Sequence, residues 1–292
     1  MSRFDIAVIG TGPAGLEAAI TAKVRNKNVL LLGSTNLSPK VEKAHTVQNY
    51  LGLPQVSGED MQKAFSRHLE SMDIVITQDR INTVYAMGSY FALQGHAGMY
   101  EADSVILACG MSAAKPFPGE LENLGRGVSY CATCDGALYK GKSALVIGYS
   151  AEEEKEADFL AEMADEVIYI PMYSRETSLN EKVRVLSGVN PVSIEKKDKR
   201  VILSLKERNI ETDGIFILRE SVAPSQLVPG LELEKNRVVV DRKQKTNIPG
   251  LFACGDITGE PYQYIKAAGE GNVAALSAVS YLAEMKAAQA QK

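Results

Sequence analysis

The chain has 292 residues, of which 45% are hydrophobic and 23% charged, a composition typical of a folded globular protein of one large or two modest domains. Its net charge of −4 argues against general nucleic-acid binding, which needs a basic surface. No apolar run approaches the ~20 residues of a membrane helix. A strand is predicted from the first residues onward, which leaves no room for a signal peptide, so we expect a cytoplasmic protein with neither a nucleic-acid nor a membrane partner.

The first predicted strand, "FDIAVI" at residues 4–9, runs into the glycine-rich turn "GTGPAG". Gly10, Gly12 and Gly15 match the spacing Gly-x-Gly-x-x-Gly, and a predicted helix and a second strand follow them. In such a unit the glycines allow a tight turn, close approach of a pyrophosphate and packing of helix on strand. The pattern predicts a dinucleotide site. Gly33-Ser34 replaces the acidic residue expected for a ribose hydroxyl, so the pattern leaves FAD and NAD open.

Two later stretches favour a flavin. "SVILACG" (104–110) and "GLFACGD" (250–256) each read as a strand that ends in a turn of small residues. The second is followed by a predicted helix with Gly269 and Gly271 at its start. Asp256 can bind a ribityl chain, and the dipole of the helix can stabilise negative charge on a reduced ring.

The four cysteines divide into one close pair and two single residues. Cys131 and Cys134 form a Cys-x-x-Cys spacing, followed by Asp135. Zinc would need about four ligands, and a reduced structural pair is a second alternative, but the spacing favours an exchangeable redox disulfide with Asp135 as a candidate proton carrier. Cys109 and Cys254 stand alone at strand ends, where we predict that they are packing residues.

A second strand–turn–helix unit departs from the nucleotide-binding pattern. Gly148 ends the strand, but Tyr149 stands where a backbone should approach a pyrophosphate. Ser150 and Glu153 have the spacing of a capping box, which would satisfy the helix N–H groups that a phosphate needs, and the acidic run "EEEKE" would repel it. The next strand, 166–170, is followed by no basic residue at once. These residues predict a pocket that holds no nucleotide, because its own serine and acids take the place of the phosphate.

The stretches "GTGPAG", "NYLGLP", "VILACG", "GVSYCATCDG", "IPGLFACGD" and "AAGEGNVAALSA" resemble the low-molecular-weight thioredoxin reductases over nearly the whole chain. The resemblance implies an α/β protein with two doubly wound, Rossmann-like domains. An FAD domain would comprise residues 1–114 and 241–292, and an inserted domain, residues 115–240, would carry the cysteine pair. It also implies a homodimer with thioredoxin as partner.

The resemblance assigns roles to individual residues. Cys134 would face the flavin, Cys131 would attack thioredoxin, and Asp135 would manage protons. No metal is implied. The expected FAD contacts are Gly10, Gly12, Gly15, Asn49, Gly110, Gly255, Asp256 and Gln263.

The altered second turn makes the chain most similar to the ferredoxin-dependent flavin thioredoxin reductases, which lack the nucleotide motifs. Electrons would then pass from ferredoxin to FAD, to the disulfide and to thioredoxin. A ferredoxin near about −400 mV and thioredoxin near about −270 mV differ by roughly 130 mV, or about 6 kcal/mol for two electrons. Two alternatives stay open: an NADPH-dependent thioredoxin reductase with an altered motif, and a non-catalytic flavoprotein that senses redox state.

Overall fold

The computed structural model describes residues 3–110, 116–219 and 224–290. The chain forms two compact units, one made of residues 1–111 and 223–292 and the other of residues 112–222. Among the described residues, no helix combines the length and the apolarity that a bilayer span requires.

The first unit is built on a seven-stranded sheet in the order β3-β2-β1-β6-β5-β4, with β17 beside β6. Strands β3, β2, β1, β6 and β17 pair with one another in parallel. On the other side of β6, β5 and β4 continue the sheet as an antiparallel meander. The buried runs of β1 and β6 form the centre of the sheet. The bounds are β1 Phe4–Ile9, β2 Val29–Leu32, β3 Ile76–Thr77, β4 Ile81–Ala86, β5 Phe91–Gly95, β6 Met99–Leu107 and β17 Leu251–Ala253.

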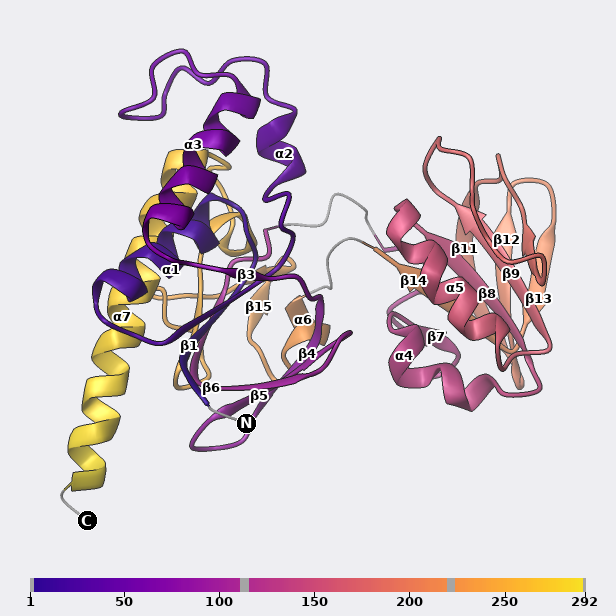
Figure 1. Ribbon diagram of the computed structural model, residues 1–292. Helices are drawn as coiled ribbons and strands as arrows, with labels where there is room; N and C mark the ends of the chain where they lie inside the picture. Colours follow the sequence, from indigo (N-terminus) through magenta and orange to yellow (C-terminus); the bar gives the residue numbers. More distant parts are fainter. Residues whose placement is uncertain (1–2, 111–115, 220–223, 291–292) are drawn as a thin grey trace. The chain divides into compact units, whose positions relative to one another are not determined.

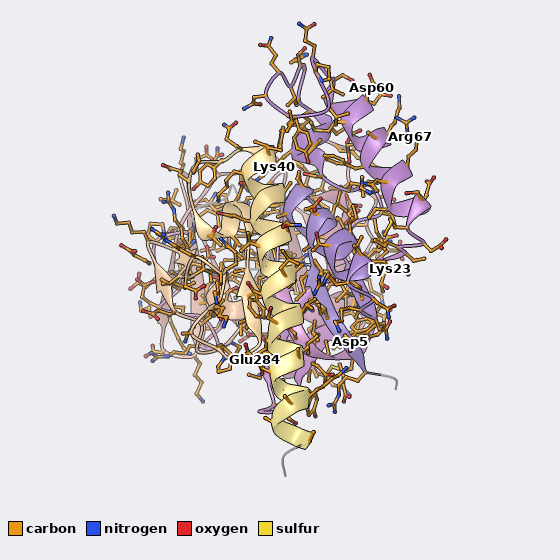
Figure 2. The ribbon with its side chains drawn as sticks, turned by 90° about the vertical axis from the view of Figure 1, so that its left-hand side faces the viewer. Asp5, Lys23, Lys40, Asp60, Arg67 and Glu284 are labelled. Carbon is orange, nitrogen blue, oxygen red and sulfur yellow. The ribbon has the colours of Figure 1, made fainter. Side chains whose placement is uncertain are left out.

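Two helices from opposite ends of the sequence, α1 (Pro13–Val24) and α7 (Tyr264–Ala290), lie side by side in this unit (Figures 1 and 2). Alanines of both helices belong to one core cluster, and Asn272 donates a hydrogen bond to the Thr21 hydroxyl across the pair at 2.9 Å. A Cβ added to Gly271 would lie 2.1 Å from the Ala14 carbonyl oxygen. Gly269 and Gly271 therefore lie inside α7 and not at its start, which corrects the sequence-based prediction. The remaining elements of the unit are α2 Pro39–Glu42, α3 Gly58–Ser71, α6 Pro224–Leu227, β15 Leu233–Glu234, β16 Arg237–Val238 and the 3-10 helix η3 Gly255–Thr258.

The second unit has three layers. Its central sheet is parallel, in the order β10-β9-β8-β14-β7. Alternate residues of β8 face opposite sides: Ala144 and Val146 pack with α4 and α5, whereas Leu145 and Ile147 pack with an antiparallel sheet, β11-β12-β13. The bounds are β7 Val128–Ser129, α4 Ala132–Asp135, η1 Gly136–Tyr139, β8 Ser143–Gly148, η2 Ala151–Glu153, α5 Glu154–Ala161, β9 Glu166–Pro171, β10 Val183–Val185, β11 Pro191–Lys197, β12 Arg200–Leu205, β13 Asn209–Thr212 and β14 Gly214–Leu218.

Two parallel-stranded α/β units confirm the predicted fold class. The division along the chain differs from the predicted boundary at 240, because the chain returns to the first unit at 223. The reason is tertiary: α6 packs against β4, and β16 packs against η3. Residues 224–238 therefore belong to the core of the first unit.

Candidate active site

The first glycine turn combines close packing with open space. Gly10 has a φ of +120°, and a Cβ there would lie 2.3 Å from the Ala108 carbonyl oxygen. A Cβ on Gly15 would lie 1.9 Å from the carbonyl oxygen of Gly10, whereas Gly12 has nothing within 4 Å. Gly12 is also the N-cap of α1, and no side chain caps that end. An uncapped helix N-terminus beside open space suits a phosphate-bearing ligand.

Other predicted ligand contacts follow neighbouring strands. Gly110 comes after β6 and has a φ of +67°, and a Cβ added there would have no neighbouring atom within 4 Å. Gly255 and Asp256 come after β17, which pairs with β6. The Lys40 ammonium lies 3.8 Å from the Asp256 carboxylate. The carboxyl ends of parallel strands are where open α/β sheets bind ligands.

The structure brings together two residues that are far apart in the sequence, Asn49 and Gln263. The side-chain amide of Asn49 donates a hydrogen bond to the Gln263 Oε1, with an N–O distance of 2.7 Å. Gln263 directly precedes α7. The prediction placed both residues at one ligand, and the structure places their two side chains next to each other.

Sequence reasoning missed the pair that fixes the turn after β17. The Glu270 Oε2 accepts hydrogen bonds from the Gly255 N–H at 2.8 Å and from the Thr258 hydroxyl at 3.1 Å. Lys266 lies 2.9 Å from the same carboxylate and donates to the carbonyl oxygens of Gly255 and Gly259. The i,i+4 spacing of Lys266 and Glu270 was the available signal.

The predicted redox segment begins where β7 ends. Cys131 is part of a disulfide, and α4 starts at the next residue. The Ser129 hydroxyl accepts from the Cys131 N–H at 3.1 Å and donates to the Asp135 Oδ2 at 2.7 Å. Asp135 also donates its backbone N–H to the Cys131 carbonyl oxygen at 3.2 Å. The segment therefore holds Asp135 beside Cys131, through a serine that the sequence analysis did not single out.

Two cysteines of the first unit are free thiols, Cys109 and Cys254. Burial raises the pKa of Cys109 to about 12. Cys254 is fully buried in the core, and burial raises its pKa as well. A thiol that stays protonated is a poor nucleophile. Cys254 packs in the core as its position predicts, whereas Cys109 is partly exposed.

The second glycine turn is filled by a tyrosine hydroxyl. A Cβ on Gly148 would lie 2.0 Å from the Tyr169 Oη, and that hydroxyl is 3.4 Å from the Ser150 carbonyl oxygen and 3.2 Å from the Tyr173 hydroxyl. Tyr173 donates to Glu154, whose other oxygen accepts from the Ser178 N–H at 2.9 Å. Burial and the bond to Glu154 raise the pKa of Tyr173 to about 12, so these phenols remain neutral donors.

The predicted capping box is wrong. The Ser150 side chain makes no capping hydrogen bond. The turn after β8 is a 3-10 turn, in which the Glu153 N–H bonds to the Ser150 carbonyl oxygen at 3.2 Å, so the backbone takes the place of the hydroxyl. Glu153 and Glu154 are 4% and 7% exposed. They belong to the interior and do not form an acidic surface.

A buried ion pair fills the same edge of the sheet. Arg219 follows β14, which pairs with β8, and its two terminal nitrogens lie 2.5 and 2.7 Å from the two carboxylate oxygens of Glu120. Glu120 is fully buried. The guanidinium carbon lies 5.2 to 5.9 Å from the centres of three rings, those of Phe117, Tyr130 and Tyr149. Tyr149 is thus part of an aromatic cage around Arg219.

A model of the pyridine nucleotide-disulphide oxidoreductases matches residues 4–271. The chain belongs to this family. A thioredoxin reductase from Peptoclostridium litorale is 32% identical over 97% of this chain and 98% of its own length. Two crystal structures of a ferredoxin-flavin thioredoxin reductase from Clostridium acetobutylicum each cover 98% of this chain and 99% of theirs; they are 51% and 48% identical, with TM-scores of 0.88 and 0.91.

This member of the pyridine nucleotide-disulphide oxidoreductases has a disulfide at Cys131 and an open glycine turn at Gly12. At its second glycine turn the Tyr169 hydroxyl packs against Gly148. The geometry therefore supports disulfide chemistry in the second unit and a dinucleotide site in the first.

Proposed function

We propose that this protein is a flavin-dependent disulfide reductase, which takes electrons from reduced ferredoxin and delivers them to the disulfide of thioredoxin. The observation that carries the proposal is the altered second turn, where the Tyr169 hydroxyl packs against Gly148 and lies 3.4 Å from the Ser150 carbonyl oxygen. Ser150 there replaces the glycine that Gly12 supplies in the first turn, so we infer that no pyridine nucleotide binds and that electrons come from another donor. The relatives from Clostridium acetobutylicum, which are ferredoxin-flavin thioredoxin reductases, support that donor and that acceptor.

The first unit suits FAD as the bound cofactor. The uncapped N-terminus of α1 and the open space at Gly12 fit a pyrophosphate. When bound, FAD would accept electrons one at a time and supply them in pairs, which is the conversion needed between a one-electron carrier and a disulfide. The residues proposed to hold it are Gly10, Gly12, Gly15, Asn49, Gly110, Gly255, Asp256 and Gln263.

The disulfide of the second unit, which we propose joins Cys131 to Cys134, would exchange with that of thioredoxin. In the reduced enzyme the Cys131 thiolate attacks one thioredoxin sulfur, the thioredoxin S–S bond breaks, and a mixed disulfide forms. Cys134 then attacks the Cys131 sulfur and releases the second thioredoxin thiol. Two electrons and two protons leave the enzyme thiols and reach the two thioredoxin sulfurs, and Asp135 carries a proton between them.

The setting is proposed to be the cytoplasm, where the enzyme works as a homodimer. Free thiols such as Cys109 and Cys254 are usual in reducing compartments.

An anaerobic titration tests the donor. The oxidised holoenzyme is mixed with NADPH or with reduced ferredoxin while the flavin absorbance is followed. We expect ferredoxin alone to bleach the flavin and thiols then to appear on thioredoxin. A Cys131→Ser variant should still bleach with ferredoxin but transfer nothing to thioredoxin. Rapid bleaching by NADPH would overturn the proposed donor, and bleaching without thioredoxin thiols in the native enzyme would overturn the proposed acceptor.

A further inference from the structure

The Ser129 hydroxyl lies between Cys131 and Asp135, two residues of the proposed redox chemistry. It accepts a hydrogen bond from the Cys131 N–H at 3.1 Å and lies 2.7 Å from the Asp135 Oδ2 and 3.3 Å from the Cys131 carbonyl oxygen. One hydroxyl proton thus has two possible acceptors, a carboxylate and a carbonyl. We propose that Ser129 is the positioning residue that holds Asp135 in both of its protonation states during thiol–disulfide exchange.

The two states follow from the hydrogen-bonding capacity of a hydroxyl, which donates once and accepts twice. When Asp135 is ionised, Ser129 donates to its carboxylate. When Asp135 has taken a proton, its O–H donates to the Ser129 Oγ, and the serine proton turns to the Cys131 carbonyl oxygen. The Cys131 N–H stays bonded in both states. Each of these partly buried polar groups therefore keeps a hydrogen-bond partner when the proton moves. A group left without a partner would disfavour the protonation state in which that happened.

The placement of Ser129 makes this arrangement rigid. Its side chain belongs to β7, where Val128 and Ser129 pair with Ile215 and Phe216 of β14, and the residue is 3% exposed. Water has little access to replace the hydroxyl. The serine is therefore fixed by the sheet, while Asp135, at the end of α4, is fixed by the serine.

The inference rests on the proposed disulfide-reductase function and predicts which step depends on Ser129. When an alkyl disulfide is reduced, its leaving thiolate is basic and takes the proton that protonated Asp135 holds; the Asp135 carboxylate regains a proton from an enzyme thiol. When an aromatic nitrothiol leaves, its low pKa makes it a good leaving group without that proton. A serine that serves proton transfer matters only for the first substrate.

The test uses the holoenzyme, reduced anaerobically with a dithiol and desalted, in three variants. Ser129→Ala removes the hydroxyl, Ser129→Thr retains it, and Ser143→Ala removes another serine–aspartate hydrogen bond of the same unit, 2.8 Å to Asp213. Each protein reacts with bis(hydroxyethyl) disulfide, with a bis(nitrophenyl) disulfide and with oxidised thioredoxin. We expect Ser129→Ala to lose about tenfold or more with the alkyl disulfide and with thioredoxin, and less than about twofold with the aromatic disulfide. Ser129→Thr and Ser143→Ala should stay within about twofold throughout.

Each other outcome decides a separate question. Equal losses of Ser129→Ala on the alkyl and aromatic disulfides would show a merely structural serine and overturn the inference, as would an unchanged rate on the alkyl disulfide. A native enzyme that shows the expected alkyl–aromatic contrast with Ser129→Ala, but does not react with thioredoxin, would overturn the proposed function and leave the role of Ser129 supported.

Discussion

At the scale of single residues, Glu120 and Arg219 form a buried ion pair. The Glu120 carboxylate accepts from the two Arg219 terminal nitrogens, from the Tyr130 hydroxyl at 2.6 Å and from the Phe117 N–H at 2.8 Å. Four donors and three flanking rings offset the cost of desolvating both ions. Burial opposes the charge of Arg219, but the bonds to Glu120 raise its pKa above the ordinary value, so the guanidinium remains charged.

Removing one ion should therefore cost far more than removing an exposed ion pair. We expect Arg219→Met to lower the free energy of unfolding by about 3–5 kcal/mol, because Glu120 is left buried without its counter-ion. The matched control is Arg184→Met, which breaks a pair with Glu166 in which both side chains are about half exposed, and should cost about 0–1 kcal/mol. Urea unfolding of the two variants measures both values; equal losses would contradict this account.

At the scale of elements, two helices determine the shape of the first glycine turn. α1 begins at that turn, and α7 packs along α1 through small side chains. At Gly271 the two helices are so close that a Cβ there would lie 2.1 Å from the Ala14 carbonyl oxygen. This close packing holds the first turn of α1 in place. The turn that would bind the pyrophosphate thus depends on a residue at the other end of the chain.

A pair of glycine substitutions in α7 tests this dependence. We expect Gly271→Ala to destabilise the protein by about 1–3 kcal/mol, because the added methyl group pushes α7 away from the backbone of α1. The amount of flavin bound per protein chain should fall as well. Gly269 has nothing within 4 Å, so Gly269→Ala should stabilise the helix by about 0.8–1 kcal/mol. Thermal unfolding and the ratio of flavin to protein absorbance report the two effects; flavin loss in Gly269→Ala alone would contradict the packing argument.

At the scale of the whole molecule, the chain forms two units, and the first is assembled from both of its ends. Three aliphatic side chains of this unit are largely exposed: Val24 at 67%, Leu51 at 90% and Val75 at 80%. Burial of apolar surface of this kind favours association. The second unit packs aliphatic side chains on both faces of its central sheet and exposes Leu121 and Leu138 by 54% and 66%.

The proposed homodimer gives a prediction at this scale. Light scattering on the purified holoenzyme should give twice the 31.6 kDa mass of the chain, and replacing Leu51 or Val75 by aspartate identifies which apolar side chains lie at the contact. Ser129→Ala serves as a variant that should not alter the mass. A single-chain mass at all protein concentrations tested would exclude the homodimer.

Features that depend on a few consecutive residues were readable from the amino-acid sequence. The alternation of apolar strand, glycine turn and helix predicted a strand–turn–helix unit at each of the two glycine turns, because strand and helix periods are local properties. The two doubly wound domains were implied by the resemblance to the thioredoxin reductases. Gly10, Gly12 and Gly15 form a turn whose geometry suits a phosphate, and the spacing of Cys131 and Cys134 pointed to redox chemistry. Each of these signals lies within a span shorter than one supersecondary unit.

Which groups lie at the second glycine turn was decided only by the tertiary structure. The sequence predicted a Ser150 cap and an acidic run at this turn, but the cap does not form and Glu153 and Glu154 are buried. The structure instead places Tyr169 against Gly148 and pairs Glu120 with Arg219, two residues that are 99 positions apart in the sequence. Which side chain fills a turn depends on which strands become neighbours, and β14 reaches β8 only when the sheet forms. Local patterns can therefore show that a glycine turn departs from the nucleotide-binding motif, but only the assembled sheet identifies the groups that lie beside it.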